Sequence, residues 1–211
     1  MAGEDARPVE DGAPDAADVR SSKIWTVPNV LSMARILLTP FFIWAMLQRR
    51  PWLALGLFLL ASVTDALDGY TARHFHLKSN LGLWLDPAGD KILLTAAFVV
   101  LTLPRLGEPN VLPVWLTAIS VGRDLLMAVG SLVYIGIRGP TVFRPTLVGK
   151  ASTVCGVATL FAVLLANALG ERPGFLPGLY LLAAVLAGSS GVHYIIRGAV
   201  RFFRERTPAA R

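Results

Sequence analysis

Six long apolar stretches, separated by short polar breaks, dominate the sequence. Each is about as long as the ~20 residues that an α-helix needs to cross a bilayer. Because a backbone inside lipid must satisfy its own hydrogen bonds, such stretches are expected to be helical. We therefore predict an all-α, polytopic membrane protein with six transmembrane helices. They are expected at residues 29–48, 52–71, 81–103, 111–137, 146–169 and 175–196.

The composition excludes the main alternatives to a membrane protein. Only 16% of the 211 residues are charged and 54% are hydrophobic, whereas a soluble domain carries roughly 25% charged residues. The chain is too apolar to be disordered, its glycines have no regular period and no heptad repeat is sustained. Disorder, a collagen helix and a coiled coil are therefore also excluded.

The charges divide the chain into three parts. Residues 1–22 hold six acids, two bases and few apolar side chains, so we expect a disordered acidic tail. The membrane domain is expected at residues 23–203 and a basic C-terminal tail at 204–211. After residue 22 the chain has 18 bases and 8 acids, a net charge of +10. This charge favours anionic membrane lipid, and not nucleic acid, as a partner.

The distribution of lysine and arginine predicts the orientation in the membrane. With six spans both termini lie on one side, which then carries twelve of these bases against four on the other side. Because basic loops remain in the cytoplasm, we expect a protein of the cytoplasmic (inner) membrane with both termini and the active site cytoplasmic. The four bases on the opposite side are Arg49, Arg50, Arg105 and Arg172.

Four of the eight acids after residue 22 lie within 26 residues, at Asp65, Asp68, Asp86 and Asp90. On helices, the i, i+3 and i, i+4 spacings place each pair on one face. A carboxylate at mid-bilayer costs ~2.5–3.5 kcal/mol, and an oxygen-only ligand set suits Mg²⁺ or Mn²⁺. We therefore predict a metal site. The alternative is a set of helix-end aspartates that pair with Arg73, Lys78 and Lys91.

The spacing of these aspartates resembles the signature of the CDP-alcohol phosphatidyltransferases. The segment reads Asp65-x2-Asp68-Gly69-x2-Ala72-Arg73-x8-Gly82-x3-Asp86-x3-Asp90 and matches every fixed position of that signature. The resemblance covers nearly all of the chain after residue 22. It implies the six-helix fold of this family, with the motif on the cytoplasmic side. It also implies the reaction, in which CDP-diacylglycerol gives its phosphatidyl group to an acceptor hydroxyl and CMP leaves.

The resemblance also implies a role for each motif residue. Two divalent ions, Mg²⁺ or Mn²⁺, would be held by Asp65, Asp68, Asp86 and Asp90, and Asp90 would also be the catalytic base. For Gly69 and Gly82 the alternative role is close helix packing. For Arg73 the alternative is a loop position on the basic, cytoplasmic side of the membrane. Members of the family form homodimers through membrane helices, so we expect a homodimer. The residues expected to bind CDP-diacylglycerol are Pro28, Asn29, Gly69, Arg73, Ser79 and Gly82.

Bases within or next to the apolar stretches are candidates for binding an acceptor phosphate, because an anion near a bilayer needs paired cations. We expect such a pocket from Arg35, Arg123, Arg144 and Lys150. For Arg35 and Lys150 the alternative is snorkelling to the interface. For Arg123 it is a local ion pair with Asp124. Lys91 is expected to pair with a motif aspartate or to snorkel.

The acceptor is predicted from finer resemblances. Val27 to Arg35, Asp86 to Lys91 and Gly149-Lys150 resemble the branch that contains phosphatidylglycerophosphate synthases and the CDP-alcohol type of cardiolipin synthase. Glycerol 3-phosphate is our first expectation, which makes the enzyme a CDP-diacylglycerol–glycerol-3-phosphate 3-phosphatidyltransferase. Phosphatidylglycerol, the acceptor of a cardiolipin synthase, is the alternative. Two details lean towards that alternative: Arg123-Asp124 in place of Arg-Glu, and Arg144-Pro145-Thr146 before Gly149.

Two other functions also place acids inside a membrane. A divalent-cation transporter would need a path through the bilayer, yet the later apolar stretches hold no second acidic cluster. An intramembrane aspartyl protease fits Gly89-Asp90 but lacks a matching Tyr-Asp partner. The sequence therefore favours the transferase.

Overall fold

Helices make up nearly all of the chain that the computed structural model describes, which is residues 27–75, 82–138 and 146–204. Its side chains are described over residues 33–64, 91–131, 133 and 146–198. No strand occurs within these ranges, so the predicted all-α class is confirmed. The helices are α1 (Val27–Leu47), α2 (Pro51–Phe75), α3 (Gly82–Thr102), α4 (Pro104–Gly107), α5 (Val114–Arg138), α6 (Leu147–Leu169) and α7 (Leu176–Arg204).

The six long helices coincide with the six predicted apolar stretches, and most of their ends differ by only a few residues. Proline begins α2 and α4 at Pro51 and Pro104, where a missing N–H costs nothing. Gly170 ends α6 in the left-handed conformation, with φ 72°, as is usual for a glycine that follows a helix. The sequence did not predict the single turn of α4, nor the extension of α7 to Arg204.

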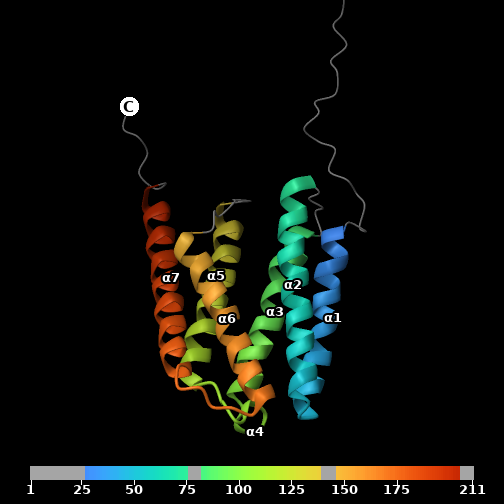
Figure 1. Ribbon diagram of the computed structural model, residues 1–211. Coiled ribbons are helices and arrows are strands. Elements are labelled where there is room, and N and C mark those ends of the chain that lie inside the picture. The colour runs from blue at the N-terminus through green and yellow to red at the C-terminus, as the bar shows by residue number, and fades with distance from the viewer. Residues whose placement is uncertain (1–26, 76–81, 139–145, 205–211) are drawn as a thin grey trace, which may run out of the picture.

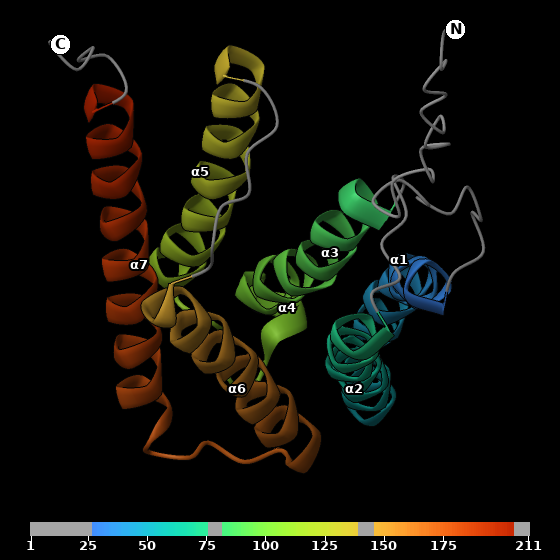
Figure 2. The ribbon, with the colours of Figure 1, turned by 90° about the horizontal axis from the view of Figure 1, so that it is seen from above.

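The long helices form two groups that are joined through α6 and α3 (Figures 1 and 2). In one group α1 packs against α2 and α3, and in the other α7 packs against α5 and α6. Contacts of α2 with α6 and of α3 with α5 connect the groups. The end of α2 and the start of α3, which carry the four aspartates, point to the same end of the bundle as the end of α7 (Figure 1). We call this the motif end, and the end that carries α4 the far end.

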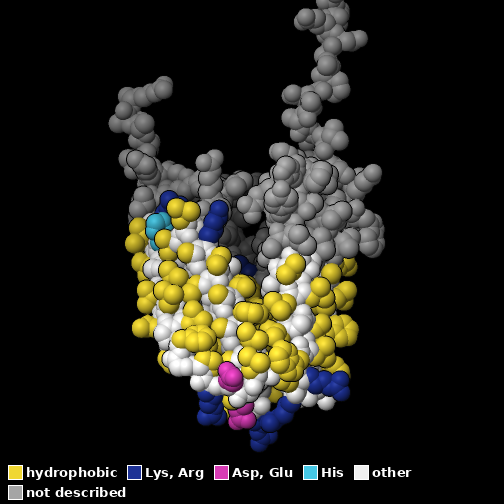
Figure 3. Space-filling view, viewed as in Figure 1, with side chains coloured by type: hydrophobic (Ala, Val, Ile, Leu, Met, Phe, Trp, Pro, Cys, Tyr) yellow, Lys and Arg dark blue, Asp and Glu magenta, His cyan; other side chains and the backbone are white. Residues whose placement is uncertain are grey.

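The surface of the bundle is that of an integral membrane protein. Apolar side chains cover the face shown in Figure 3 between the two ends. Over the described residues, α5, α6 and α7 are long and apolar enough to cross a membrane. The other three long helices contribute shorter apolar stretches, Met33–Leu47, Pro51–Thr64 and Lys91–Thr102. Three candidate spans are thus shown, and the full set of six remains a prediction.

Tryptophans and charges mark the far end. Trp44 in the last turn of α1, Trp52 in the first turn of α2 and Trp115 in the first turn of α5 are 46%, 59% and 47% exposed. Exposed tryptophans at one level are typical of the membrane–water interface. Lys, Arg, Asp and Glu side chains also gather at this end (Figure 3). They are Arg49, Arg50, Arg105, Glu108, Glu171 and Arg172, which includes all four bases predicted to share the side opposite the termini.

The described apolar core fixes the helices relative to one another. Phe42 of α1 and Phe58 of α2 are fully buried, with ring centroids 6.4 Å apart. Leu101 of α3 and Leu164 of α6 are also fully buried in this cluster. Small side chains let the backbones approach closely, as in other membrane helix pairs. Those with no exposed surface are Ala45, Ala54, Ala61 and Ala97.

Candidate functional site

The motif aspartates lie on two helices at the motif end. Asp65 and Asp68 are within α2, and Asp86 and Asp90 are within α3. Because both segments are helical, each pair of aspartates lies on one helix face, as the spacing predicts. The side chains themselves lie outside the described ones, so the predicted metal site stays a prediction. Among the described side chains, no three His, Cys, Asp or Glu lie close enough to hold a metal.

The residues predicted to bind CDP-diacylglycerol lie near the motif-end termini of α1, α2 and α3 where the structure describes them. Pro28 and Asn29 are in the first turn of α1, which packs against both α2 and α3. Gly69 and Arg73 lie in the last two turns of α2, and Gly82 is the first residue of α3. The side chains of these residues are not described. Ser79 and Arg144 lie outside the described residues altogether.

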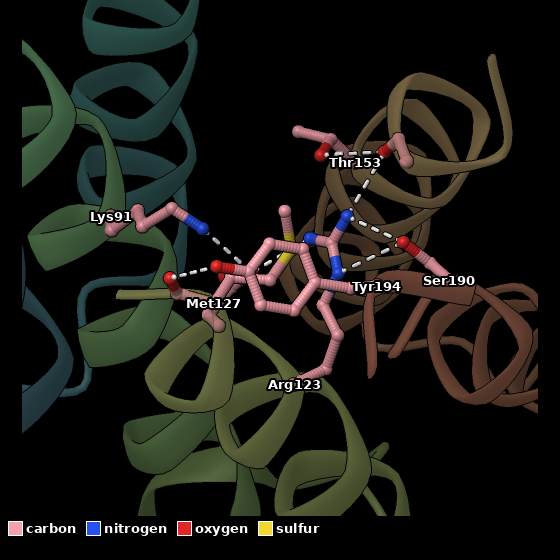
Figure 4. A network of polar contacts seen from close by, with 8 residues as sticks. Lys91, Arg123, Met127, Thr153, Ser190 and Tyr194 are labelled. Carbon is pink, nitrogen blue, oxygen red and sulfur yellow. Dashed lines mark hydrogen bonds and ion pairs between the residues drawn. The ribbon is translucent and has the colours of Figure 1, made fainter. Parts of the chain in front are cut away.

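Arg123 of α5 is the centre of a polar network that reaches three other helices (Figure 4). Its Nη1 donates to Asp124 Oδ1 at 2.7 Å, and its Nη2 donates to the carbonyl oxygen of Gly149 at 3.2 Å. Nε and Nη2 both donate to Ser190 Oγ of α7, at 3.3 and 3.0 Å. The local pair with Asp124, which was the alternative prediction, is therefore present. Ser190 was not predicted from the sequence, because its only signal there is a polar residue within an apolar stretch.

Lys91 connects this network to the motif helix. Its Nζ lies 2.7 Å from Asp124 Oδ1, the same oxygen that Arg123 contacts. Lys91 directly follows Asp90 in α3, so the ion pair ties the motif helix to α5 beside the last motif residue. We had expected Lys91 to pair with a motif aspartate or to snorkel, and the structure pairs it with Asp124. Spacing within one helix could not reveal this contact, because the partners are 33 residues apart.

The start of α6 is held against Arg123. Thr146 caps the helix, because its Oγ1 accepts a hydrogen bond from the Gly149 N–H at 3.0 Å. A Cβ on Gly149 would lie 3.1 Å from Thr146 Oγ1 and 3.4 Å from Arg123 Nη2. Glycine therefore permits the close approach of the Arg123 guanidinium to the start of α6. The next residue, Lys150, is exposed and makes no ion pair with any described residue.

Hydrogen bonds between α5 and α7 continue from Arg123 and Ser190 towards the motif end. Tyr194 Oη donates to the Met127 carbonyl oxygen at 3.3 Å and lies 3.0 Å from Ser131 Oγ. A Cβ on Gly130 would lie 3.0 Å from the Tyr194 ring. The absence of a side chain at Gly130 thus lets the ring sit over α5.

A cavity of about 30 Å³ adjoins the network between α3, α5, α6 and α7. Its polar lining comes from Ser120, Arg123, Asp124, Ser152 and Thr153, and its apolar lining includes Phe98. A cavity of this volume holds one or two water molecules. It is too small for a substrate, so it belongs to the support of the site rather than to a substrate pocket.

Arg35 differs from the other candidate bases because it is buried, with 2% of its surface exposed. It lies in α1, two turns after Asn29. The Arg35 side chain is therefore enclosed by other residues, whereas a snorkelling side chain would be exposed at the surface. Thr39 Oγ1 donates to the Arg35 carbonyl oxygen at 3.0 Å.

Comparison with known proteins gives consistent matches. Residues 25–190 match the sequence profile described as CDP-alcohol phosphatidyltransferase. The chain is 37% identical to the rat (Rattus norvegicus) "Cardiolipin synthase (CMP-forming)" over 68% of its length and 47% of that protein's. A protein of the same name from Streptomyces coelicolor is 38% identical over 64% and 63% of the two lengths. The chain is 31% identical to the "CDP-diacylglycerol--glycerol-3-phosphate 3-phosphatidyltransferase" of Bacillus subtilis, over 72% and 83%.

Proposed function

This chain belongs to the CDP-alcohol phosphatidyltransferase family, and from that membership we propose that it is a cardiolipin synthase. It would transfer the phosphatidyl group of CDP-diacylglycerol to a hydroxyl of phosphatidylglycerol and release CMP. The names of the rat and Streptomyces relatives carry this proposal. They favour it over glycerol 3-phosphate, the first expectation from the sequence.

Glycerol 3-phosphate is the second candidate acceptor. The observation in its favour is the Bacillus subtilis relative, because the alignment covers 83% of that protein against 47% of the rat protein. Both acceptors present a hydroxyl and a phosphate. The two candidates therefore share one mechanism and differ in the size of the group that the site must admit.

The transfer requires a base and no protein nucleophile. The acceptor oxygen attacks the phosphorus of the phosphatidyl group, and its proton passes to the carboxylate of Asp90. A new phosphodiester bond forms while the bond to CMP breaks, and the electron pair of that bond leaves with CMP. The ion pair of Lys91 with Asp124 supports this role, since it holds α3 to α5 one residue beyond Asp90.

Asp65, Asp68, Asp86 and Asp90 are the residues that we propose to hold two divalent ions. Their carboxylates offer only oxygen, the ligand that Mg²⁺ and Mn²⁺ prefer. Such ions, when bound, supply stabilisation of the attacking and leaving oxygens. The helical i, i+3 and i, i+4 pairs on α2 and α3 are the structural support for this assignment.

For the donor we propose binding by Pro28, Asn29, Gly69, Arg73, Ser79 and Gly82. The support is positional. The first turn of α1, the last two turns of α2 and the start of α3 all lie at the motif end (Figure 1). The guanidinium of Arg73 suits the oxygens of a pyrophosphate. The glycines leave room for the backbone to approach it.

For the acceptor phosphate we propose Lys150 as a direct cation and Arg123 as its positioning residue. Most N–H groups of Arg123 already bond to Asp124, Ser190 and the carbonyl of Gly149, so this side chain fixes the residue next to Lys150. Lys150 is exposed in the first turn of α6. Arg35 and Arg144 complete the proposed region.

Acceptor use is tested by one assay that resolves the lipid products by mass. We expect purified protein with CDP-diacylglycerol, Mg²⁺ and phosphatidylglycerol to yield cardiolipin and CMP in equal amounts. Glycerol 3-phosphate and myo-inositol serve as the compared acceptors. Formation of phosphatidylglycerophosphate, without cardiolipin, would overturn the proposed acceptor and leave the transferase reaction intact.

Replacing Lys150 by glutamine is expected to raise the KM for the acceptor roughly tenfold, because a charge-assisted hydrogen bond to phosphate is lost. The KM for CDP-diacylglycerol should remain unchanged. Arg197→Gln is the matched control, since Arg197 is also an exposed cation on the motif-end half of its helix. Equal effects of the two variants on the acceptor KM would assign the effect to general surface charge.

We also propose that the motif end faces the cytoplasm and that the chain forms a homodimer in the inner membrane. The excess of lysine and arginine on the side of the termini supports this orientation. The exposed apolar helix faces are compatible with a dimer contact. Labelling of the termini in intact cells would test the orientation. Chemical crosslinking in native membranes would test the homodimer.

A further inference from the structure

A second polar pocket lies at the far end, opposite the motif aspartates. Its volume is about 180 Å³, and the turn between α1 and α2, the α4 segment and the end of α6 line it. Its charged residues are Arg49, Arg50, Arg105 and Glu108. This pocket has no part in the transfer reaction proposed above, because the reaction requires the motif end.

The pocket carries an excess of positive charge. Three arginines and one glutamate give a net charge of +2, and all four side chains are exposed. None of these four side chains has its charged atoms within 4 Å of an opposite charge on another described residue. Arg50 instead lies over the ring of Trp44, 5.8 Å from its centroid. The guanidinium groups therefore remain available to an anion.

One of these arginines is held in an unfavourable backbone conformation. The Arg50 N–H bonds to the Ala45 carbonyl at 2.9 Å, and the Arg49 N–H to the Met46 carbonyl at 3.0 Å. These two bonds form the turn that usually places glycine after a helix. Here Arg49 occupies that position with φ 52°, a conformation that is costly for any residue with a Cβ. Strain of this kind is typical of functional positions.

The opposite wall of the pocket is rigid. Asn167 Oδ1 accepts bonds from both the backbone N–H and the Nδ2 of Asn110, each at 2.9 Å. Asn167 Nδ2 donates to the Gly107 carbonyl at 2.8 Å. A Cβ on Gly107 would lie only 2.1 Å from the Leu101 carbonyl oxygen, so glycine is required there. The segment that carries Arg105 and Glu108 is thus fixed to α6.

We propose that this pocket binds the phosphate of an anionic phospholipid in the leaflet opposite the active site. The exposed Trp44 and Trp52 flank the turn that carries Arg49 and Arg50, which places the pocket at the depth of lipid headgroups. Arginine forks match phosphate oxygens. A net charge of +2 favours an anionic lipid over a zwitterionic one. The pocket is thus a lipid site that is distinct from the donor and acceptor sites.

Thermal unfolding of the full chain in phosphatidylcholine–detergent micelles, titrated with phosphatidylserine, tests the proposal. Phosphatidylserine is anionic and is neither the proposed donor nor the proposed acceptor. We expect it to raise the melting temperature. Arg49→Gln and Arg105→Gln should each require about fivefold more of it for the same shift. Arg172→Gln, which removes an exposed charge at the same end but outside the pocket, should behave like the wild type.

Arg49→Gly should change the melting temperature and the response to phosphatidylserine in opposite directions. Relief of the left-handed strain should raise the melting temperature in phosphatidylcholine alone, while the response to phosphatidylserine should weaken. A fold defect cannot produce this combination. Stabilisation of the wild type by inorganic phosphate alone, or by added phosphatidylcholine as strongly as by phosphatidylserine, would overturn the proposal. Equal loss in Arg172→Gln and Arg105→Gln would also overturn it.

Discussion

Replacing Asp90 by asparagine is expected to lower the rate of CMP release by about a thousandfold or more. The amide has nearly the shape of the carboxylate but cannot accept the proton of the acceptor hydroxyl, and loss of a general base costs about 10²–10⁴ in rate. Asp90 is also one of the four proposed metal ligands, so the substitution weakens a second function. The measurement is CMP released per minute at saturating CDP-diacylglycerol and acceptor.

A matched control removes a carboxylate at the far end. Glu171→Gln is suitable, because the Glu171 side chain is exposed and only its backbone N–H and carbonyl take part in described hydrogen bonds. We expect activity close to that of the wild type in this variant. If Asp90→Asn kept more than a small fraction of the turnover while folding normally, Asp90 would not be the base.

Chelation of divalent ions is expected to abolish turnover completely. Four carboxylates that share one end of two helices repel one another unless cations lie between them, and the leaving phosphate needs the charge that such ions supply. Activity measured after treatment with EDTA should be absent, and it should return on addition of Mg²⁺ or Mn²⁺. Ca²⁺ offers a comparison with a larger ion of the same charge.

A metal-dependent melting temperature separates binding from catalysis. Mg²⁺ or Mn²⁺ should stabilise the wild type, since a ligand that binds only the folded state raises its stability. The same ions should stabilise a variant without Asp65 and Asp86 much less. Full turnover in EDTA would rule out the metal mechanism, whatever the melting curves show.

The helices could be predicted well because length and hydropathy determine them. Stretches of about 20 apolar residues between prolines, glycines and arginines left few other structures for the chain. The single turn of α4 was missed because Pro104–Gly107 has no apolar period. The extension of α7 beyond Ile196 was missed because its last residues are basic, and hydropathy alone does not mark a helix that leaves the membrane.

Only those residues of the candidate site that lie close together in the sequence could be predicted from it. The motif could be recognised because its residues follow a fixed spacing on two neighbouring helices. The contact of Lys91 with Asp124 joins helices that are distant in the chain, and no spacing rule covers it. Likewise, Arg49 and Arg105 were counted only as loop charges that orient the chain, since their shared pocket exists only after folding.

The cluster around Asp124 is electrostatically unbalanced. Lys91 and Arg123 bring two positive charges to one carboxylate oxygen, so within the described side chains the cluster has a surplus of one positive charge. The Arg123 side chain is only 8% exposed, and water there can screen this surplus poorly. Among the described side chains, a net positive charge thus lies between α3, α5 and α6. The acceptor phosphate that we propose to bind at Lys150, the residue after Gly149, would meet this charge without any rearrangement of the protein.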